Sequence, residues 1–145
     1  MNNPDKNTLA IICGGGPAPG INCVISSVTI MARKYGWEVF GIYDGFANLG
    51  KGEKKFLPLD LDNVSRIYSE GGSILRMSRF NPTKSEAALK KVVDAADYMG
   101  IPMIFVPGFH QSTLHSEEDW EYACKSFQYL CDLAGEKGIQ VGYEN

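Results

Sequence analysis

The sequence predicts an α/β fold: a single three-layer αβα sandwich, Rossmann-like or flavodoxin-like, with about five mostly parallel strands over residues 1–145. Short apolar runs alternate along the chain with longer segments whose apolar residues recur every three or four positions. This alternation is typical of parallel strands joined by helices that cover both faces of the sheet. A closed barrel of eight such units takes about 250 residues, more than this chain has.

The expected elements follow one another in regular order. The first apolar run ends in three glycines, as a strand buried on both faces does before a tight turn. A short extra strand is expected at 56–57. The predicted core strands cover residues 9–13, 37–43, 73–78, 102–106 and 139–143. Apolar residues at helical spacing cover residues 21–32, 64–68, 89–96 and 120–131.

Two helix starts can be read directly from the sequence. Thr83 and Glu86 have the spacing of a capping box. Ser116 is followed by three acidic residues, which favour the positive end of a helix dipole. In the helix that starts at Ser116, Trp120 and Phe127 share the stripe that we expect to be buried.

Composition limits the classes of partner. The net charge of −3 argues against nonspecific attraction to nucleic acid or to an anionic membrane. No apolar run approaches the roughly 20 residues of a membrane span, and the N-terminus lacks the basic-then-apolar pattern of an export signal. We therefore expect a cytoplasmic protein, a monomer or a homodimer, whose partner is a small anion or a nucleotide.

The glycine-rich segment 14–20 follows the first predicted strand and leads into a helix. Ligands of open parallel sheets gather at this end of the strands, and glycines let backbone N–H groups approach an anion closely. The segment lacks the Lys-Ser/Thr of a Walker loop and does not fit GxGxxG. A tight turn that needs glycine for its backbone angles explains the same residues equally well.

Two motifs in the first 90 residues resemble the phosphofructokinase family. Residues 15–22 read GGPAPGIN, and residues 71–79 read GGSILRMSR. In that family the first loop lies against the nucleotide or pyrophosphate that donates the phosphoryl group. The resemblance implies binding of ATP, pyrophosphate, phosphate or sulfate. We expect this chain itself to require no cofactor. Its phosphate-binding candidates here are Gly15, Gly16, Gly20 and Arg79, and the planar fork of an arginine suits phosphate.

The sequence departs from the family after this arginine. The family continues with a strand that ends in a GGD segment holding magnesium, whereas here the strand is followed by Pro107-Gly108-Phe109-His110. The TIDND-like segment that supplies the aspartate base is also missing. Phosphoryl transfer depends on a metal and on a group that orients the nucleophile. We therefore expect no catalytic residues and no enzyme activity, with ligand binding at most.

Residues 92–112 read VVDAADYMGIPMIFVPGFHQS, and residues 123–145 read ACKSFQYLCDLAGEKGIQVGYEN. The segment from about residue 90 to 145 resembles a fragment of the xylose-isomerase-like sugar isomerase/epimerase TIM barrels, and this resemblance implies that Glu144 stands at the position of a metal ligand. One carboxylate with a distant His110 makes a poor metal site, so we expect no bound metal. The leading hypothesis is an engineered chimera with its seam near residues 85–100 and no native activity. The alternatives are a natural phosphate- or nucleotide-binding domain related to phosphofructokinase, and a remnant of a metal-dependent sugar isomerase.

Overall fold

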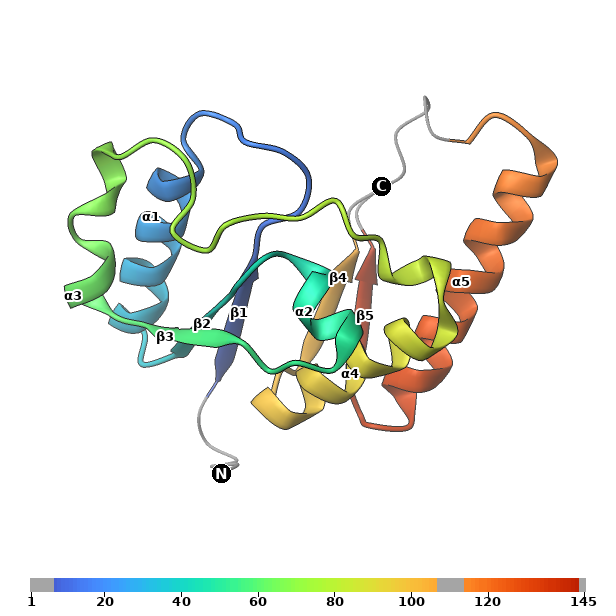
Figure 1. Ribbon diagram of the computed structural model, residues 1–145. Helices are drawn as coiled ribbons and strands as arrows, with labels where there is room; N and C mark the ends of the chain where they lie inside the picture. The colour runs from blue at the N-terminus through green and yellow to red at the C-terminus, as the bar shows by residue number, and fades with distance from the viewer. Residues whose placement is uncertain (1–6, 107–113, 144–145) are drawn as a thin grey trace.

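The computed structural model describes residues 7–106 and 114–143, and it confirms an α/β fold in which strands and helices alternate (Figure 1). The strands are β1 (Thr8–Ile12), β2 (Glu38–Ile42), β3 (Phe56–Leu59), β4 (Met103–Val106) and β5 (Gln140–Tyr143). The helices are α1 (Ile21–Lys34), α2 (Phe46–Lys51), α3 (Leu61–Val64), α4 (Glu86–Met99) and α5 (Glu117–Gly135), with 3-10 turns η1 (Ile67–Ser69) and η2 (Pro82–Lys84). Within the described ranges, none of the helices has the length and apolarity that crossing a bilayer requires.

The strands form two sheets, so the prediction of one continuous sheet is wrong. β1 pairs in parallel with β2, and β3 pairs antiparallel with the other edge of β2. β4 and β5 form a separate parallel pair. Ile104 and Val106 of β4 are partly buried and pack against the core that α4 and α5 share on that side of the molecule. One face of β4 therefore packs on its own side of the molecule, while Met103 and Phe105 on the other face are 46% and 59% exposed.

The predicted core strand at 73–78 is absent, because this segment is a turn. The backbone N–H of Arg76 donates to the carbonyl of Ser73 at 3.0 Å, and the Leu75 N–H donates to the Ser73 hydroxyl at 3.2 Å. Of the apolar pair Ile74-Leu75, which suggested a strand, Leu75 lies in the core with no exposed surface, and Ile74 packs partly buried against the same core. The third strand beside β2 is instead β3, where a short extra strand was expected.

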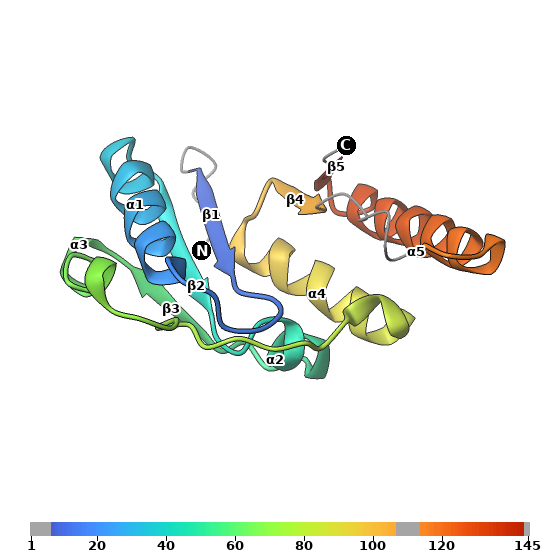
Figure 2. The same ribbon diagram turned by 90° about the horizontal axis from the view of Figure 1, so that it is seen from above.

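Helices cover both faces of the β1–β3 sheet. Figure 2 shows α1 and α3 on one side of this sheet and α2 and α4 on the other. Ile25 of α1 and Val64 of α3 pack on Val39 of β2 and form the first core. On the opposite face Ile42 of β2 packs with Leu49 of α2 and with α4. The layers are those of an αβα arrangement around these three strands.

Helix α4 contributes to the cores on both sides of itself. Val92 and Ala95 belong to the core under β2 and α2. Leu89, Val93 and Ala96 lie in a different core, which α4 shares with α5, β4 and β5. Because the two strand groups do not pair with each other among the described residues, the packing of α4 is the main connection between them.

The predicted start of α5 is confirmed, whereas the cap of α4 lies two residues after the predicted cap, Thr83. Ser116 caps α5, and its hydroxyl and the Asp119 carboxylate form a reciprocal capping box. Helix α4 is capped by Ser85, whose side chain accepts from the N–H of Ala88, while Thr83 lies in the preceding 3-10 turn. The expected burial of Trp120 is wrong, because 58% of its surface is exposed.

Truncation of Leu89 tests the role of α4. Leu89 is 4% exposed, and Leu89→Ala should lower the free energy of unfolding by about 2–4 kcal/mol, because it removes buried methyl groups and leaves a cavity. Leu61→Ala, at a side chain that is 53% exposed, is the matched control and should change it by less than about 0.5 kcal/mol. Urea unfolding measures both, and equal effects of the two variants would contradict this account.

Candidate functional site

The glycine-rich loop after β1 and the segment before η2 meet at the carboxyl end of β1. Gly14 forms an isolated parallel bridge with Ser78, and the Gly15 N–H donates to the Ser78 carbonyl at 3.0 Å. Figure 1 shows the yellow-green segment crossing the end of the blue strand at this point. The two motifs of the sequence, residues 15–22 and 71–79, are therefore joined in space by backbone contacts.

Asn22, in the first turn of α1, fixes the crossing segment in place. Its side-chain amide N–H groups donate to the carbonyls of Glu70 at 3.2 Å and Gly71 at 3.3 Å. Its side-chain oxygen accepts the N–H of Ile74 at 2.9 Å. Asn22 is 2% exposed, and these hydrogen bonds are partly buried. One side chain thus satisfies three backbone groups that no strand partner would satisfy.

Leu75 anchors the same segment on the sheet. Its side chain lies directly over Gly41 of β2, where any β-carbon would overlap it. The Leu75 carbonyl accepts the N–H of Asp44 at 2.9 Å. The end of β2 is thereby tied to the segment that carries the two arginines, Arg76 and Arg79.

The glycines of the loop fall into two groups. Gly15 has a φ of 87° and Gly20, which caps α1, has a φ of 84°. These angles favour glycine, so a turn requirement explains both residues. Gly14 and Gly16 do not have a positive φ. A β-carbon on Gly14 would meet nothing within 4 Å, and a β-carbon on Gly16 would meet the Arg79 side chain. Backbone geometry therefore does not explain Gly14 and Gly16.

Arg79 lies over the loop at Gly16. A β-carbon on Gly16 would come within 3.2 Å of Arg79 Nη2. No acidic side chain of residues 7–106 and 114–143 lies within ion-pair distance of this guanidinium. The structure thus brings together Gly15, Gly16 and Arg79, three of the four residues predicted to bind phosphate. Gly20 lies at the far end of the loop, where α1 begins.

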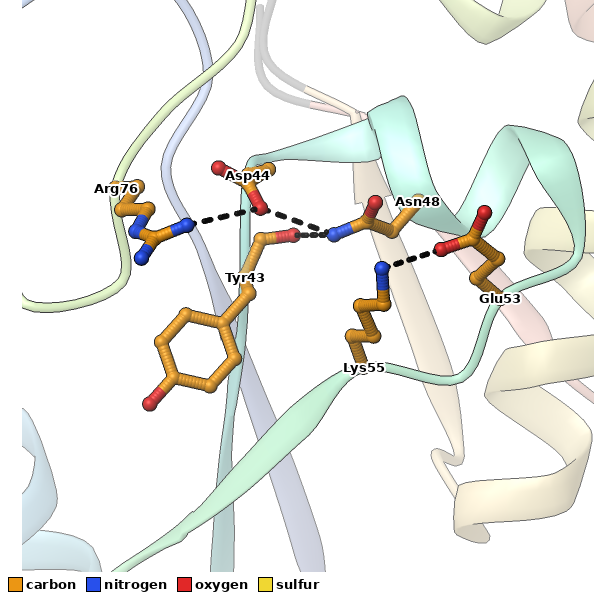
Figure 3. Close-up of polar contacts among 6 residues, drawn as sticks. All are labelled: Tyr43, Asp44, Asn48, Glu53, Lys55 and Arg76. Carbon is orange, nitrogen blue, oxygen red and sulfur yellow. Dashed lines mark hydrogen bonds and ion pairs between the residues drawn. The ribbon is translucent and has the colours of Figure 1, made fainter.

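A second polar cluster lies beside the loop at the end of β2 (Figure 3). Asp44 accepts a hydrogen bond from Asn48 at 3.1 Å and pairs with Arg76 at 4.0 Å. The same amide of Asn48 donates to the Tyr43 carbonyl at 3.1 Å. Farther along, the ammonium of Lys55 lies 2.6 Å from the Glu53 carboxylate. This contact lowers the pKa of Glu53 below its ordinary value by hydrogen bonding and by charge.

The residues considered for metal binding, Glu144 and His110, lie outside the described residues. Within the parts of the chain that the structure describes, no three His, Cys, Asp or Glu side chains are grouped to hold a metal ion. No step proposed below uses a metal.

Sequence reasoning missed two residues that shape the site. Asn22 lies in an apolar helical stripe and Asn48 in a short helix, and both are largely buried. A buried amide is costly unless its hydrogen bonds are made. An asparagine inside the GGPAPGIN motif, at a position that helical spacing predicts to face the core, was the available signal for Asn22.

A glycine-rich loop at the end of a parallel strand, crossed by an arginine-bearing segment, defines an α/β protein of the class that gathers ligands at this end of its strands. The sequence model described as Phosphofructokinase matches residues 8–120, more than half of the chain. The chain belongs to the phosphofructokinase family.

Named relatives support this assignment. The pyrophosphate–fructose 6-phosphate 1-phosphotransferase of Thermotoga maritima is 54% identical over 101 residues, which are 69% of this chain and 24% of that protein. The ATP-dependent 6-phosphofructokinase of Lactobacillus acidophilus is 41% identical over 100 residues, or 69% of this chain and 31% of that protein. The chain thus spans about a quarter to a third of the length of these relatives. The crystal structure of Pichia pastoris phosphofructokinase has the same fold, with a TM-score of 0.70 and 23% identity over 95% of this chain and 14% of that one.

These matches overturn the chimera hypothesis. The family match runs through the predicted seam near residues 85–100 and ends at residue 120, and α4 is one unbroken helix across most of that seam. Nothing in these matches supports a TIM-barrel fragment. The reading of the sequence as an engineered protein is therefore wrong, and the alternative of a natural phosphofructokinase relative is better supported. Phosphofructokinases and sugar isomerase TIM barrels are both built of βα units. The apolar pattern after residue 90 therefore resembles both families.

Gly45 gives a test of how the site is assembled. A β-carbon there would lie 2.8 Å from the Cys13 carbonyl oxygen and 3.1 Å from the Ser78 nitrogen, at a φ of 56°. Gly45→Ala should lower the free energy of unfolding by about 2–3 kcal/mol through strain and overlap. Gly71→Ala, where a β-carbon meets nothing within 4 Å, should cost less than about 1 kcal/mol. Thermal melting of both variants measures the difference, and equal stability would show that this contact does not constrain the fold.

Proposed function

We propose that this chain binds the phosphoryl donor of a phosphofructokinase-family enzyme, through the loop 14–20 and the guanidinium of Arg79. One observation carries the proposal: Arg79 lies over Gly16 without an acidic partner among the described residues. Gly16 has no backbone angle that calls for glycine. A cation without a counter-charge above an open backbone suits a phosphate group.

The proposed contacts divide between backbone and side chain. The backbone of Gly15 and Gly16 would approach the phosphate from one side, since no side chain shields it, and Arg79 would hold the opposite side. Gly20 begins α1, whose dipole adds a favourable potential at the end of the loop. A ligand with several negative charges should bind most strongly, because the proposed contacts are electrostatic attractions.

Two donors fit this site, and the relatives favour pyrophosphate. The 54% identical Thermotoga protein is named for pyrophosphate, and the 41% identical Lactobacillus protein for ATP. We propose pyrophosphate as the donor, with ATP as the second candidate. Fructose 6-phosphate, which the Thermotoga name includes, is then the proposed acceptor in the whole enzyme. The segments that the family uses for magnesium and for the aspartate base do not occur in this sequence, so we assign donor binding, not transfer, to these 145 residues.

Replacement of Arg79 tests the proposal. Arg79→Ala should weaken the binding of pyrophosphate by about 1.5–3 kcal/mol, the range for a hydrogen bond to a charged group, which is roughly 10- to 150-fold in Kd. Arg66→Ala, at an exposed arginine that follows α3, removes the same charge elsewhere and should leave Kd within about twofold. Isothermal calorimetry with pyrophosphate, ATP, ADP and phosphate measures the affinities. Absence of binding at millimolar ligand would reject the proposed function. Tighter binding of ATP than of pyrophosphate would reject the choice of donor.

Gly16→Ala separates ligand binding from stability. The only atoms near the added methyl group belong to the Arg79 guanidinium, which is the mobile end of a long side chain. The free energy of unfolding should therefore change by less than about 1 kcal/mol, whereas pyrophosphate binding should weaken by about tenfold or more as the arginine is displaced. Calorimetry and urea unfolding of the same preparation give both values. Unchanged affinity would show that the ligand does not use this part of the loop.

A further inference from the structure

Asp44 and Arg76 share an unusual backbone conformation and contact each other. Their φ angles are 59° and 56°, and they are the non-glycine residues with positive φ in the described parts of the chain. Side chains are disfavoured in this region, and such strain is often found at functional sites. The Arg76 side chain is 74% exposed and the Asp44 side chain 36% exposed, and ion pairs that water reaches add little stability. Stability alone therefore does not account for the pair.

The two partners differ in how firmly they are held. The Asp44 N–H is bonded to Leu75, and its carboxylate accepts from Asn48 at 3.1 Å. The Arg76 backbone closes the turn that starts at Ser73, but its side chain is 74% exposed and touches Asp44 only at 4.0 Å. Asp44 is thus the fixed member of the pair, and the Arg76 guanidinium is free to exchange its partner.

The pair lies beside the proposed donor site. Gly45, next to Asp44, packs against the Cys13 carbonyl and the Ser78 nitrogen, which are the residues that precede Gly14 and Arg79. Figure 3 shows the Arg76 side chain reaching from its own segment toward the end of β2. The Arg76 guanidinium therefore lies at the same end of the sheet as the loop, and an anion on the loop would attract it across partly exposed surface, where screening by salt is incomplete.

Building on the proposed donor site, we propose that Arg76 is a specificity-determining residue that recognises the outer phosphate of an inorganic polyphosphate. In the empty site Asp44 holds the guanidinium beside the loop. When pyrophosphate binds, Arg76 exchanges the carboxylate for the outer phosphate, while Arg79 remains on the inner one. A monophosphate offers no outer group, so the exchange favours pyrophosphate over phosphate.

Three variants test this exchange by calorimetry with pyrophosphate and with inorganic phosphate. Arg76→Gly suits the backbone angle and should preserve folding, while weakening pyrophosphate binding about three- to tenfold and leaving phosphate binding within about twofold. Asp44→Asn keeps a residue that tolerates positive φ and removes the competing charge. It should tighten pyrophosphate binding about two- to threefold. The double variant should bind no more tightly than Arg76→Gly, and Arg66→Ala controls for net charge.

The outcomes distinguish this inference from the proposed function. If the unmodified chain binds neither ligand, the donor site itself is wrong and this inference is lost with it. If Arg79→Ala weakens binding and Arg76→Gly does not, the donor site stands and the role of Arg76 is rejected. Equal losses for pyrophosphate and phosphate in Arg76→Gly would likewise reject it, because the residue would then provide charge without specificity. Circular dichroism and melting temperature establish that each variant is folded.

Discussion

The side-chain amide of Asn22 makes three hydrogen bonds to the segment 70–74, and these bonds hold the chain that leads to Arg76 and Arg79 against the end of β1. The segment crosses the end of β1 as a turn, so its backbone groups have no strand to pair with. Buried backbone groups must find partners, and Asn22 supplies them from the first turn of α1. Because Leu75 is buried in the same segment, the chain that carries the two arginines is anchored here, with Arg79 over Gly16 and Arg76 beside Asp44. The glycine loop and the arginines would otherwise be two unrelated surface segments.

The same reasoning explains why the site does not depend on the second sheet. Its residues lie between β1 and the start of η2, and their contacts are made within that range. Helix α4 follows the site and packs on both sides, against the first sheet and against β4, β5 and α5. It therefore supports the sheet beneath the site through Val92 and Ala95, without contributing a ligand-binding side chain.

Most elements could be predicted from the sequence, because their apolar patterns are long and regular. Helices α1, α4 and α5 and strands β1, β2, β4 and β5 lie close to their expected positions. The segment 73–78 could not, since Ile74 and Leu75 give the same apolar signal in a strand and in an anchored turn. Gly15, Gly16 and Arg79 were predicted from motifs, and their meeting in space needed the bridge from Gly14 to Ser78. The pair of Asp44 and Arg76 could not be predicted, because residue type does not reveal a positive φ.

The distribution of charge around the loop argues for a ligand with more than one phosphate. The chain carries a net charge of −3, yet two arginines converge on one end of β1 with a single carboxylate, Asp44, described beside them. Arg79 has no acidic partner in the described structure, so its charge is available to a first phosphate. Arg76 has a partner that is solvent-exposed and 4.0 Å away, and a doubly charged phosphate attracts a guanidinium more strongly than such a carboxylate does. A monophosphate would satisfy the first arginine and leave the second where it is. The difference between the two arginines is thus the physical basis on which the loop can distinguish pyrophosphate from its hydrolysis product.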